Sequence, residues 1–165
     1  MQVREIMSSP AITVSPATPV QEVARIMREN HISGMPVVNE AGELMGIVSE
    51  LDLIARSAPL REPTYVTFLS AIIPLSFEKY REYKEQLRQT LATNAEELMG
   101  VDDLERATVS PDTPIEEALG RMLNPEITIL PVVEAGQVMG VVTRTDMVQL
   151  IEQLELELIR REEEE

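Results

Sequence analysis

The 165-residue sequence has no cysteine, no tryptophan and only one histidine, and aromatic residues make up 3% of it. Without cysteine there is neither a disulfide framework nor a thiolate metal ligand, which fits a reducing compartment. The single histidine, His31, precedes a predicted strand and has no second ligand nearby, so we assign it a surface or helix-terminus role. A glycine-rich phosphate loop, a Ser-His-Asp set and a metal cluster are all missing from the sequence pattern. We therefore expect no catalytic residues, no metal site and no enzyme.

The chain also lacks a long apolar run and an excess of positive charge. Its most apolar stretch, residues 66–75, contains Pro74 and is shorter than the ~20 residues that a membrane-spanning helix needs. The first residues lack the apolar segment of a secretion signal, so we expect a soluble cytoplasmic protein without a membrane partner. A net charge of -15 disfavours binding to nucleic acid. A small anionic ligand remains feasible, because helix N-termini and one local arginine can supply a positive field.

What the sequence does contain is an internal repeat. Three ordered blocks recur 95, 95 and 94 residues further along: 13–22 as 108–117, 36–38 as 131–133, and 40–46 as 134–140. The second copy has thus lost the equivalent of Asn39. We divide the chain into a first repeat (1–57), a helical insert (58–93) and a second repeat (94–165). Each copy is too small to bury both of its faces alone, so the copies should pack against each other.

Local signals predict the same elements in both repeats: strand, helix, strand, strand, helix. A helix is predicted after each Thr-Pro pair, where Thr18 and Thr113 are the expected N-caps and Gln21 and Glu116 the capping-box partners. Apolar residues then recur with the i, i+3, i+4, i+7 spacing of one helix face. In the first repeat, strands are expected over about 35–39 and 44–49, with a helix from Glu50. The predicted fold class is α/β.

The insert and the C-terminal helix both carry apolar surface. Residues 77–91 are predicted to be a helix, and the apolar run 66–73 should either cover the module or form a subunit interface, which we favour. The helix predicted from Thr145 is apolar over more than one face, which suits packing against a second chain. The expected partner is therefore another copy of the chain, and residues 162–165 are expected to be a solvated tail.

The sharpest local motif is Gly-Ile-Val-Ser-Glu-Leu-Asp at 46–52, which recurs as Gly-Val-Val-Thr-Arg-Thr-Asp at 140–146. The glycine allows another group to approach the strand, and a hydroxyl and then a carboxylate begin the next helix. Ser49 with Asp52, and Thr143 with Asp146, also satisfy a helix-capping pattern. They could therefore serve only to satisfy backbone amides, and this structural interpretation stays open beside a ligand-binding one.

The doubled motif, downstream of a helix and a Pro-Val-Val strand, resembles the cystathionine-β-synthase-type (CBS) domain, and the tandem arrangement resembles a CBS pair. The resemblance covers about 3–56 and 94–154. It implies two βαββα repeats related by pseudo-twofold symmetry with an insert between them. It also implies ligand clefts between the repeats and, commonly, a dimer shaped as a flat disk of four repeats.

The resemblance further implies which residues bind a ligand. In family members that bind adenosine compounds, the motif aspartate accepts hydrogen bonds from both ribose hydroxyls, and the Ser or Thr helps to hold ribose or phosphate. These roles carry over to Asp52 with Ser49 and to Asp146 with Thr143, and a carboxylate suits a vicinal diol because it can accept from both donors. The implied adenine-pocket residues are Ser33, Gly34, Met35, Pro36, Ile129, Leu130 and Pro131, with Ile12, Thr13, Ala107 and Thr108 as the opposite wall.

The two implied sites differ in charge. Arg144 follows Thr143 at a helix start, where it could meet a phosphate, whereas the matching residue Glu50 would repel one. We therefore expect the Asp146 site to prefer phosphorylated nucleotides. The Asp52 site should be weaker for charged ligands or take a neutral adenosine group. The alternative is that Arg144 is a solvated surface charge.

Together, these features predict a regulatory, energy-sensing module rather than an enzyme. It would bind AMP, ADP, ATP, S-adenosylmethionine or NAD between the repeats and signal to another protein, whose identity the sequence does not give. No cofactor is required, and whether magnesium accompanies the phosphates is open. The alternative is a structural or dimerisation module whose nucleotide sites are vestigial.

Overall fold

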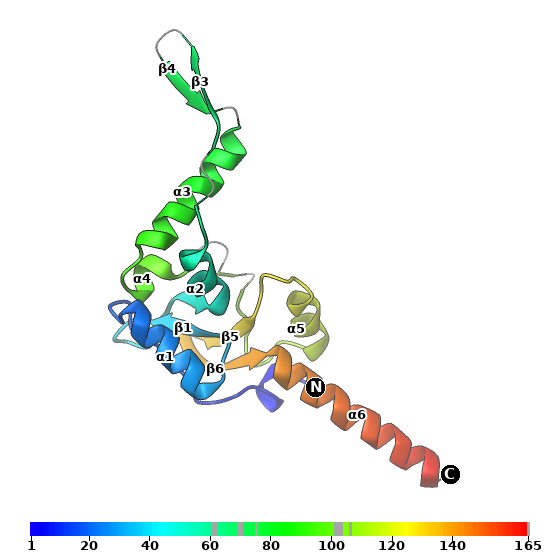
Figure 1. The fold of residues 1–165 in the computed structure, drawn as a ribbon. Helices are drawn as coiled ribbons and strands as arrows, with labels where there is room; N and C mark the ends of the chain where they lie inside the picture. Colours follow the sequence, from blue (N-terminus) through cyan, green and yellow to red (C-terminus); the bar gives the residue numbers. More distant parts are fainter. Residues whose placement is uncertain (61–62, 69–70, 75, 101–103, 106, 165) are drawn as a thin grey trace.

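The two repeats form two separate antiparallel strand pairs flanked by helices, as the ribbon of the computed structural model shows (Figure 1). The structure describes residues 1–60, 63–68, 71–74, 76–100, 104–105 and 107–164. Its elements are η1 (Val3–Glu5), α1 (Val20–Asn30), β1 (Gly34–Val38), β2 (Leu44–Ser49), α2 (Glu50–Ser57), β3 (Tyr65–Phe68), β4 (Ala71–Pro74), α3 (Phe77–Leu91), α4 (Ala95–Leu98), α5 (Ile115–Met122), β5 (Ile129–Glu134), β6 (Gln137–Thr143) and α6 (Arg144–Glu164). The α/β fold with two tandem repeats is confirmed.

The strand pairs follow the same plan in both repeats. β1 pairs with β2 and β5 with β6, and each pair has a register shift at equivalent places, after Val37 and after Val132. A short parallel bridge adds the predicted first strand to each pair, through Val14 beside Val37 and Val109 beside Val132. The predicted strand over 44–49 and the helix from Glu50 have the observed bounds.

The predicted helix caps are wrong. α1 begins after Pro19, which is its N-cap residue, and no side chain caps the helix. The Thr18 hydroxyl instead accepts a hydrogen bond from the Ser15 backbone N–H at 3.2 Å, so it closes the preceding turn. The second repeat repeats this arrangement. Thr18 and Thr113 are therefore not the N-caps, and Gln21 and Glu116 are not their capping-box partners.

Each repeat lends a segment to the core of the other. Ala95 and Leu98 of α4, from the start of the second repeat, are fully buried in the core of the first. Val3 of η1 is fully buried in the core of the second repeat. The backbone follows the same exchange, because Gly100 bridges to Ile47 of β2 and Ser8 bridges to Val141 of β6. The repeats cannot separate without opening both cores.

The motif glycines are required by this exchange. A Cβ atom on Gly46 would lie 2.5 Å from the Met99 sulfur and 2.9 Å from the Gly100 carbonyl oxygen. A Cβ atom on Gly140 would lie 2.6 Å from the Ser8 carbonyl oxygen. The prediction that these glycines admit a close neighbour is confirmed, and the neighbour is the exchanged segment.

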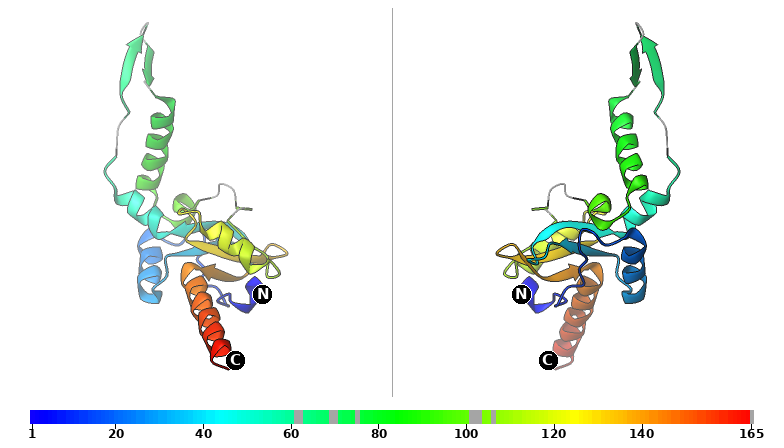
Figure 2. Two further views of the ribbon diagram at one scale, coloured as in Figure 1. Left: turned by 90° about the vertical axis from the view of Figure 1, so that its right-hand side faces the viewer. Right: turned by 90° about the vertical axis from the view of Figure 1, so that its left-hand side faces the viewer.

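The insert and α6 extend away from the body in different directions (Figures 1 and 2). α3 has its predicted bounds, and β3 pairs with β4 in an antiparallel hairpin. The apolar run 66–73 was predicted to form a subunit interface. Residues 69–70, and the side chains of the strand residues in this run, lie outside the part of the chain that the structure describes, so the interface stays a prediction. α6 is helical through Glu164, so most of the predicted C-terminal tail is helix. Among the described residues, no helix is both long and apolar enough to cross a membrane.

Candidate functional site

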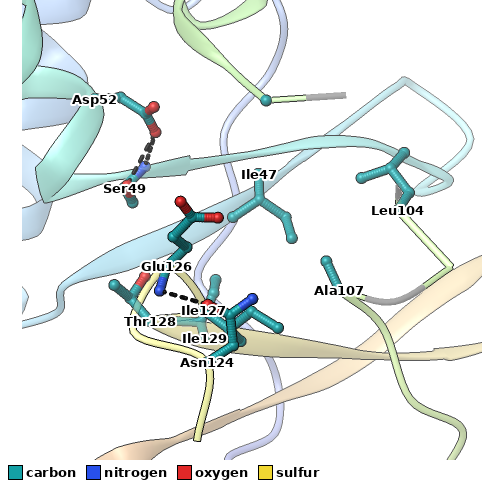
Figure 3. Close-up of a pocket in the computed structure, with 11 residues that line it drawn as sticks. Ile47, Ser49, Asp52, Leu104, Ala107, Asn124, Glu126, Ile127, Thr128 and Ile129 are labelled. Atoms are coloured by element: carbon teal, nitrogen blue, oxygen red, sulfur yellow. Dashed lines mark hydrogen bonds between the residues drawn. The ribbon is translucent and has the colours of Figure 1, made fainter. Parts of the chain in front are cut away.

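Two clefts between the repeats contain the motif carboxylates. The Asp52 cleft has a volume of about 480 Å³ and is lined by Ile47, Ser49, Asp52, Gly100, Leu104, Ala107, Asn124, Glu126, Ile127, Thr128 and Ile129 (Figure 3). The Asp146 cleft has a volume of about 410 Å³ and is lined by Ser8, Pro10, Ile12, His31, Ile32, Ser33, Gly34, Val141, Thr143, Thr145 and Asp146. Both volumes lie within the ~300–1,000 Å³ range of small-molecule sites.

Each cleft combines the carboxylate of one repeat with a loop of the other. Asp52 of the first repeat faces residues 126–129 of the second, and Asp146 of the second faces residues 31–34 of the first. These two loop segments are equivalent under the 95-residue repeat. The clefts are therefore related by the pseudo-twofold symmetry of the module, and neither is complete without both repeats.

One oxygen of each motif carboxylate caps its own helix. Asp52 Oδ2 accepts hydrogen bonds from the backbone N–H of Ser49 at 2.7 Å and from its hydroxyl at 3.0 Å (Figure 3). Asp146 Oδ2 accepts from the backbone N–H of Thr143 at 2.7 Å and from its hydroxyl at 2.6 Å. The capping interpretation of the motif is therefore confirmed for both copies.

The second carboxylate oxygen is less engaged. Asp52 Oδ1 has no hydrogen-bond partner among the residues that the structure describes, and Asp146 Oδ1 accepts only a long bond of 3.4 Å from the Ser8 hydroxyl. Capping thus uses one oxygen of a carboxylate that lines the cleft and leaves the other oxygen able to accept a further hydrogen bond. Helix capping and ligand binding by the same carboxylate are compatible.

Asp52 is electrostatically unusual. Burial raises the pKa of its carboxyl group, while the two hydrogen bonds from Ser49 and the positive charge of Arg88 oppose that rise. Glu85 raises the pKa slightly further. Arg88 and Glu85 belong to α3, so the insert brings both charges next to the Asp52 cleft. A carboxylate that has lost part of its hydration gains more from a new hydrogen-bond donor than an exposed one does.

The structure divides the predicted site residues into two clefts and a buried group. Those that line the Asp52 cleft are Ser49, Asp52, Ala107 and Ile129. Those that line the Asp146 cleft are Ile12, Ser33, Gly34, Thr143 and Asp146. The ones fully buried in the cores are Met35, Pro36, Leu130 and Pro131. Thr13 and Thr108 are partly buried and do not line either cleft. The buried residues lie on β1 and β5, and their ligand-binding role stays a prediction.

Arg144 lies elsewhere than predicted. Its Nη2 donates to the carbonyl oxygens of Pro125 at 3.0 Å, Ile127 at 3.1 Å and Asn124 at 3.3 Å. Side chains of a helix point toward its N-terminus, so the first residue of α6 reaches back to this loop. The loop lines the Asp52 cleft, whereas Arg144 does not line the Asp146 cleft. This placement does not favour a phosphate contact beside Asp146, which stays an untested prediction, and the counterpart Glu50 lines neither cleft.

Several residues that line the clefts were not identified as site residues from the sequence. His31 occupies the predicted helix terminus, as the left-handed C-cap of α1, but it also lines the Asp146 cleft. Glu126 and Thr128 line the Asp52 cleft at the positions equivalent to His31 and Ser33. The 95-residue repeat could have identified Thr128 from Ser33. Among the described residues, no group of three or more histidines and acidic residues is placed to hold a metal ion.

Comparison with known proteins gives consistent matches. The CBS domain model matches residues 3–58 and 101–153. The protein MJ1426 of Methanocaldococcus jannaschii is 32% identical over 157 residues, which is 92% of this chain and 91% of that one. The chloroplast protein CBSX2 of Arabidopsis thaliana is 27% identical over 145 residues, 87% of this chain and 60% of that one.

Solved structures show the same fold. The crystal structure of CBSX2 in complex with AMP has a TM-score of 0.73 at 24% identity, covering 92% of this chain and 97% of that one. The CBS domain pair of protein MJ0100, in complex with 5'-methylthioadenosine and S-adenosyl-L-methionine, has a TM-score of 0.66 at 23% identity, covering 93% and 97%. At these identities the likeness concerns the fold.

Proposed function

The chain belongs to the CBS-domain family, and from this premise we propose that it is a regulatory module that binds adenosyl ligands between its repeats. One observation carries the proposal: each motif aspartate lines an inter-repeat cleft and caps its helix with Oδ2, which leaves Oδ1 without a short hydrogen bond. The AMP bound to CBSX2 and the adenosyl ligands bound to MJ0100 support it, because those proteins share this fold.

In this proposal the ribose of the ligand lies against the carboxylate. The two ribose hydroxyls donate to Asp52 or Asp146, and charge assistance makes these bonds stronger than neutral ones. The adenine lies against the apolar residues of the facing loop, such as Ile127 and Ile129 in the Asp52 cleft and Ile32 in the Asp146 cleft. AMP, ADP and ATP are the first candidates, with magnesium as a companion of the longer phosphate chains, followed by S-adenosylmethionine and NAD.

Signalling would follow from the composite clefts. A ligand that contacts both repeats shifts the balance between two relative placements only by its difference in affinity for them. A coupling of about 1–3 kcal/mol is usual for such a switch. Because the cores exchange segments, a change in either cleft is transmitted to both repeats. In this proposal, the responding protein is another chain or another copy of this one.

We also propose that the module is a homodimer. Ile54 of α2 and Val148 of α6 are equivalent under the repeat, and their exposures are 64% and 66%. Leu51 and Ile151 on the same two helices are also exposed. Paired apolar residues of this kind on two surface helices are the expected footprint of a second copy.

A second candidate function has an observation in its favour. Both capping boxes are complete without any ligand, so the motif could be kept for stability alone in a structural module with vestigial sites. Isothermal calorimetry and thermal unfolding with AMP, ADP, ATP, NAD and S-adenosylmethionine separate the two. A ligand at 100 times its dissociation constant should add about 2.7 kcal/mol to stability.

Matched variants sharpen the test. Asp52→Asn and Asp146→Asn keep the size of the side chain and an oxygen that can cap the helix, but remove the charge that a ribose diol would use. Each should weaken binding to its own cleft by about tenfold. Asp112→Asn, on an exposed ion pair with Arg4, is the control. The absence of binding by every compound would leave the structural module as the function.

A further inference from the structure

We propose that the two clefts select ligands of different charge, and that His31 and Glu126 set the difference. The proposal rests on the adenosyl-binding function and names the ligand class of each cleft. The Asp146 cleft takes an adenosine compound with a phosphate at the 5' position. The Asp52 cleft takes one whose 5' substituent is uncharged or positively charged.

The two residues hold equivalent positions but carry different groups, an imidazole in one cleft and a carboxylate in the other. His31 lines the Asp146 cleft and Glu126, 95 residues further on, lines the Asp52 cleft. Among the described lining residues, Asp146 is the only carboxylate of its cleft, whereas Asp52 shares its cleft with Glu126. The described lining of the Asp52 cleft includes no Lys, Arg or His, and Arg88, which lies beside Asp52 on α3, is accompanied there by the carboxylate of Glu85.

The remaining polar lining strengthens this contrast. The Asp146 cleft adds hydroxyl groups from Ser8, Ser33, Thr143 and Thr145 to the imidazole of His31. Hydroxyl and imidazole N–H groups donate hydrogen bonds to phosphate oxygens. The Asp52 cleft adds the amide of Asn124 and the hydroxyls of Ser49 and Thr128. Two carboxylates in one cleft repel a phosphate, and the repulsion is stronger there than in open water.

The loop that carries Glu126 is held in place. The Glu126 backbone N–H donates to the Asn124 side-chain oxygen at 3.0 Å. Arg144 Nη2 binds the carbonyl oxygens on both sides of Glu126, those of Pro125 and Ile127. Arg144 and Glu126 do not form an ion pair, and Figure 3 shows the Glu126 carboxyl group directed away from its own loop toward the β2 side of the cleft. Its charge therefore stays available to a ligand.

The backbone of His31 is held at the C-terminal end of α1. It adopts the left-handed conformation, with φ of 54°, that ends α1, and its backbone N–H donates to the Met27 carbonyl oxygen. From this backbone position, His31 lines the Asp146 cleft. The difference in charge between the clefts is thus built into two ordered loop positions.

The charge rule predicts which ligand goes where. AMP should fill the Asp146 cleft first. 5'-Methylthioadenosine, which keeps the ribose and adenine but has a neutral thioether at the 5' position, should lose that preference. S-adenosyl-L-methionine carries a positive sulfonium at the same position and should favour the Asp52 cleft.

Isoleucine-methyl NMR distinguishes the two clefts in the intact protein. Ile12 and Ile32 report on the Asp146 cleft, and Ile47 and Ile129 report on the Asp52 cleft. In titrations with AMP, the first pair should shift at about tenfold lower concentration than the second, the ratio expected for one charge-assisted hydrogen bond. With 5'-methylthioadenosine the two pairs should respond within a factor of about three.

Two substitutions assign the effect to the named residues. Glu126→Gln should raise AMP affinity at Ile47 and Ile129 by about tenfold without changing 5'-methylthioadenosine binding. His31→Asn, chosen because Asn tolerates the left-handed conformation, should weaken AMP at Ile12 and Ile32 and spare 5'-methylthioadenosine. Glu40→Gln, in the turn between β1 and β2, is the matched control for loss of one negative charge.

The outcomes are distinct. Equal ranking of the clefts by AMP and 5'-methylthioadenosine, or an unchanged AMP affinity in Glu126→Gln, overturns the charge rule while leaving adenosyl binding intact. If neither compound moves either pair of methyl signals, adenosyl binding itself fails, and the charge rule fails with it.

Discussion

Arg144 lies two residues before Asp146, yet its Nη2 donates at 3.1 Å to the carbonyl oxygen of Ile127, which lines the other cleft. The helix that begins beside one carboxylate therefore holds the loop that faces the other. The first repeat makes a similar link through its backbone, because the Glu50 N–H donates to the Ser33 carbonyl oxygen at 2.9 Å. These contacts join the two clefts physically.

Arg144→Ala should loosen the loop at residues 124–127. Three carbonyl oxygens lose a charged donor, which should lower the free energy of unfolding by about 1–2 kcal/mol. Amide hydrogen exchange should quicken in that loop, while AMP binding to the Asp146 cleft stays the same. Arg160→Ala on the same helix is the control. A selective loss of AMP binding at Ile12 and Ile32 would instead return Arg144 to the phosphate role.

Gly46→Ala and Gly140→Ala should each cost about 1–3 kcal/mol of stability, because an added Cβ atom meets the exchanged segment. Gly140→Ala should be at least as costly, since its closest contact, at 2.6 Å, is a backbone oxygen rather than a flexible methionine. Gly120→Ala in α5 is the control: nothing lies within 4 Å of its Cβ, so it should stabilise by about 0.5–1 kcal/mol. Chemical denaturation measures all three, and a neutral Gly140→Ala would contradict the packing described here.

Asp52 should titrate above the ordinary aspartate range. Its raised pKa means that the folded state holds a proton to higher pH than the unfolded chain does. Its contribution to stability is thus greatest below about pH 4 and is lost as the pH rises through the folded-state pKa. Relative to Asp52→Asn, the wild-type protein should lose stability over that window.

Ligand binding reverses this pH trend. Ribose hydroxyls donate to the ionised carboxylate, so a ligand in the Asp52 cleft should lower the pKa of Asp52 and bind more tightly as the pH rises. Carboxyl-carbon NMR of Asp52, with and without 5'-methylthioadenosine, measures both effects. A titration at or below the usual aspartate value in the free protein would show that burial does not dominate at this residue.

Val148→Glu should convert the proposed dimer to monomer. The substitution places a charge among the exposed apolar residues of α6, where burial in an interface would be costly. Leu123→Glu, at a site that is 84% exposed after α5, is the control and should leave the assembly unchanged. Sedimentation equilibrium provides the measurement. A wild-type protein that is monomeric at micromolar concentration would refute the dimer.

Strong local signals made much of the fold predictable. Turn residues, helix-start residues and the spacing of apolar residues predicted three elements with their observed bounds: the strand Leu44–Ser49, the helix from Glu50 and the helix Phe77–Leu91. The N-cap assignment failed at Thr18 because a hydroxyl before proline fits a turn and a helix cap equally well. The sequence pattern does not show which backbone N–H the hydroxyl meets.

The site was predictable only in part. Family resemblance located Asp52 and Asp146, but the crosswise pairing of each carboxylate with the opposite loop depends on how the repeats pack. The same holds for Arg144, whose partners are carbonyl oxygens about 20 residues earlier in the chain. His31 was assigned a surface or helix-terminus role and Glu126 was not singled out, because nothing in their neighbours along the chain reveals the cleft that they line.

A crystal structure of the protein grown with AMP would show whether a motif aspartate holds the ribose of a nucleotide. We expect density for AMP in the Asp146 cleft, with both ribose hydroxyls within hydrogen-bonding distance of the Asp146 carboxylate and the phosphate beside His31. A cleft without ligand at saturating AMP, or a ribose that contacts neither motif aspartate, would contradict it.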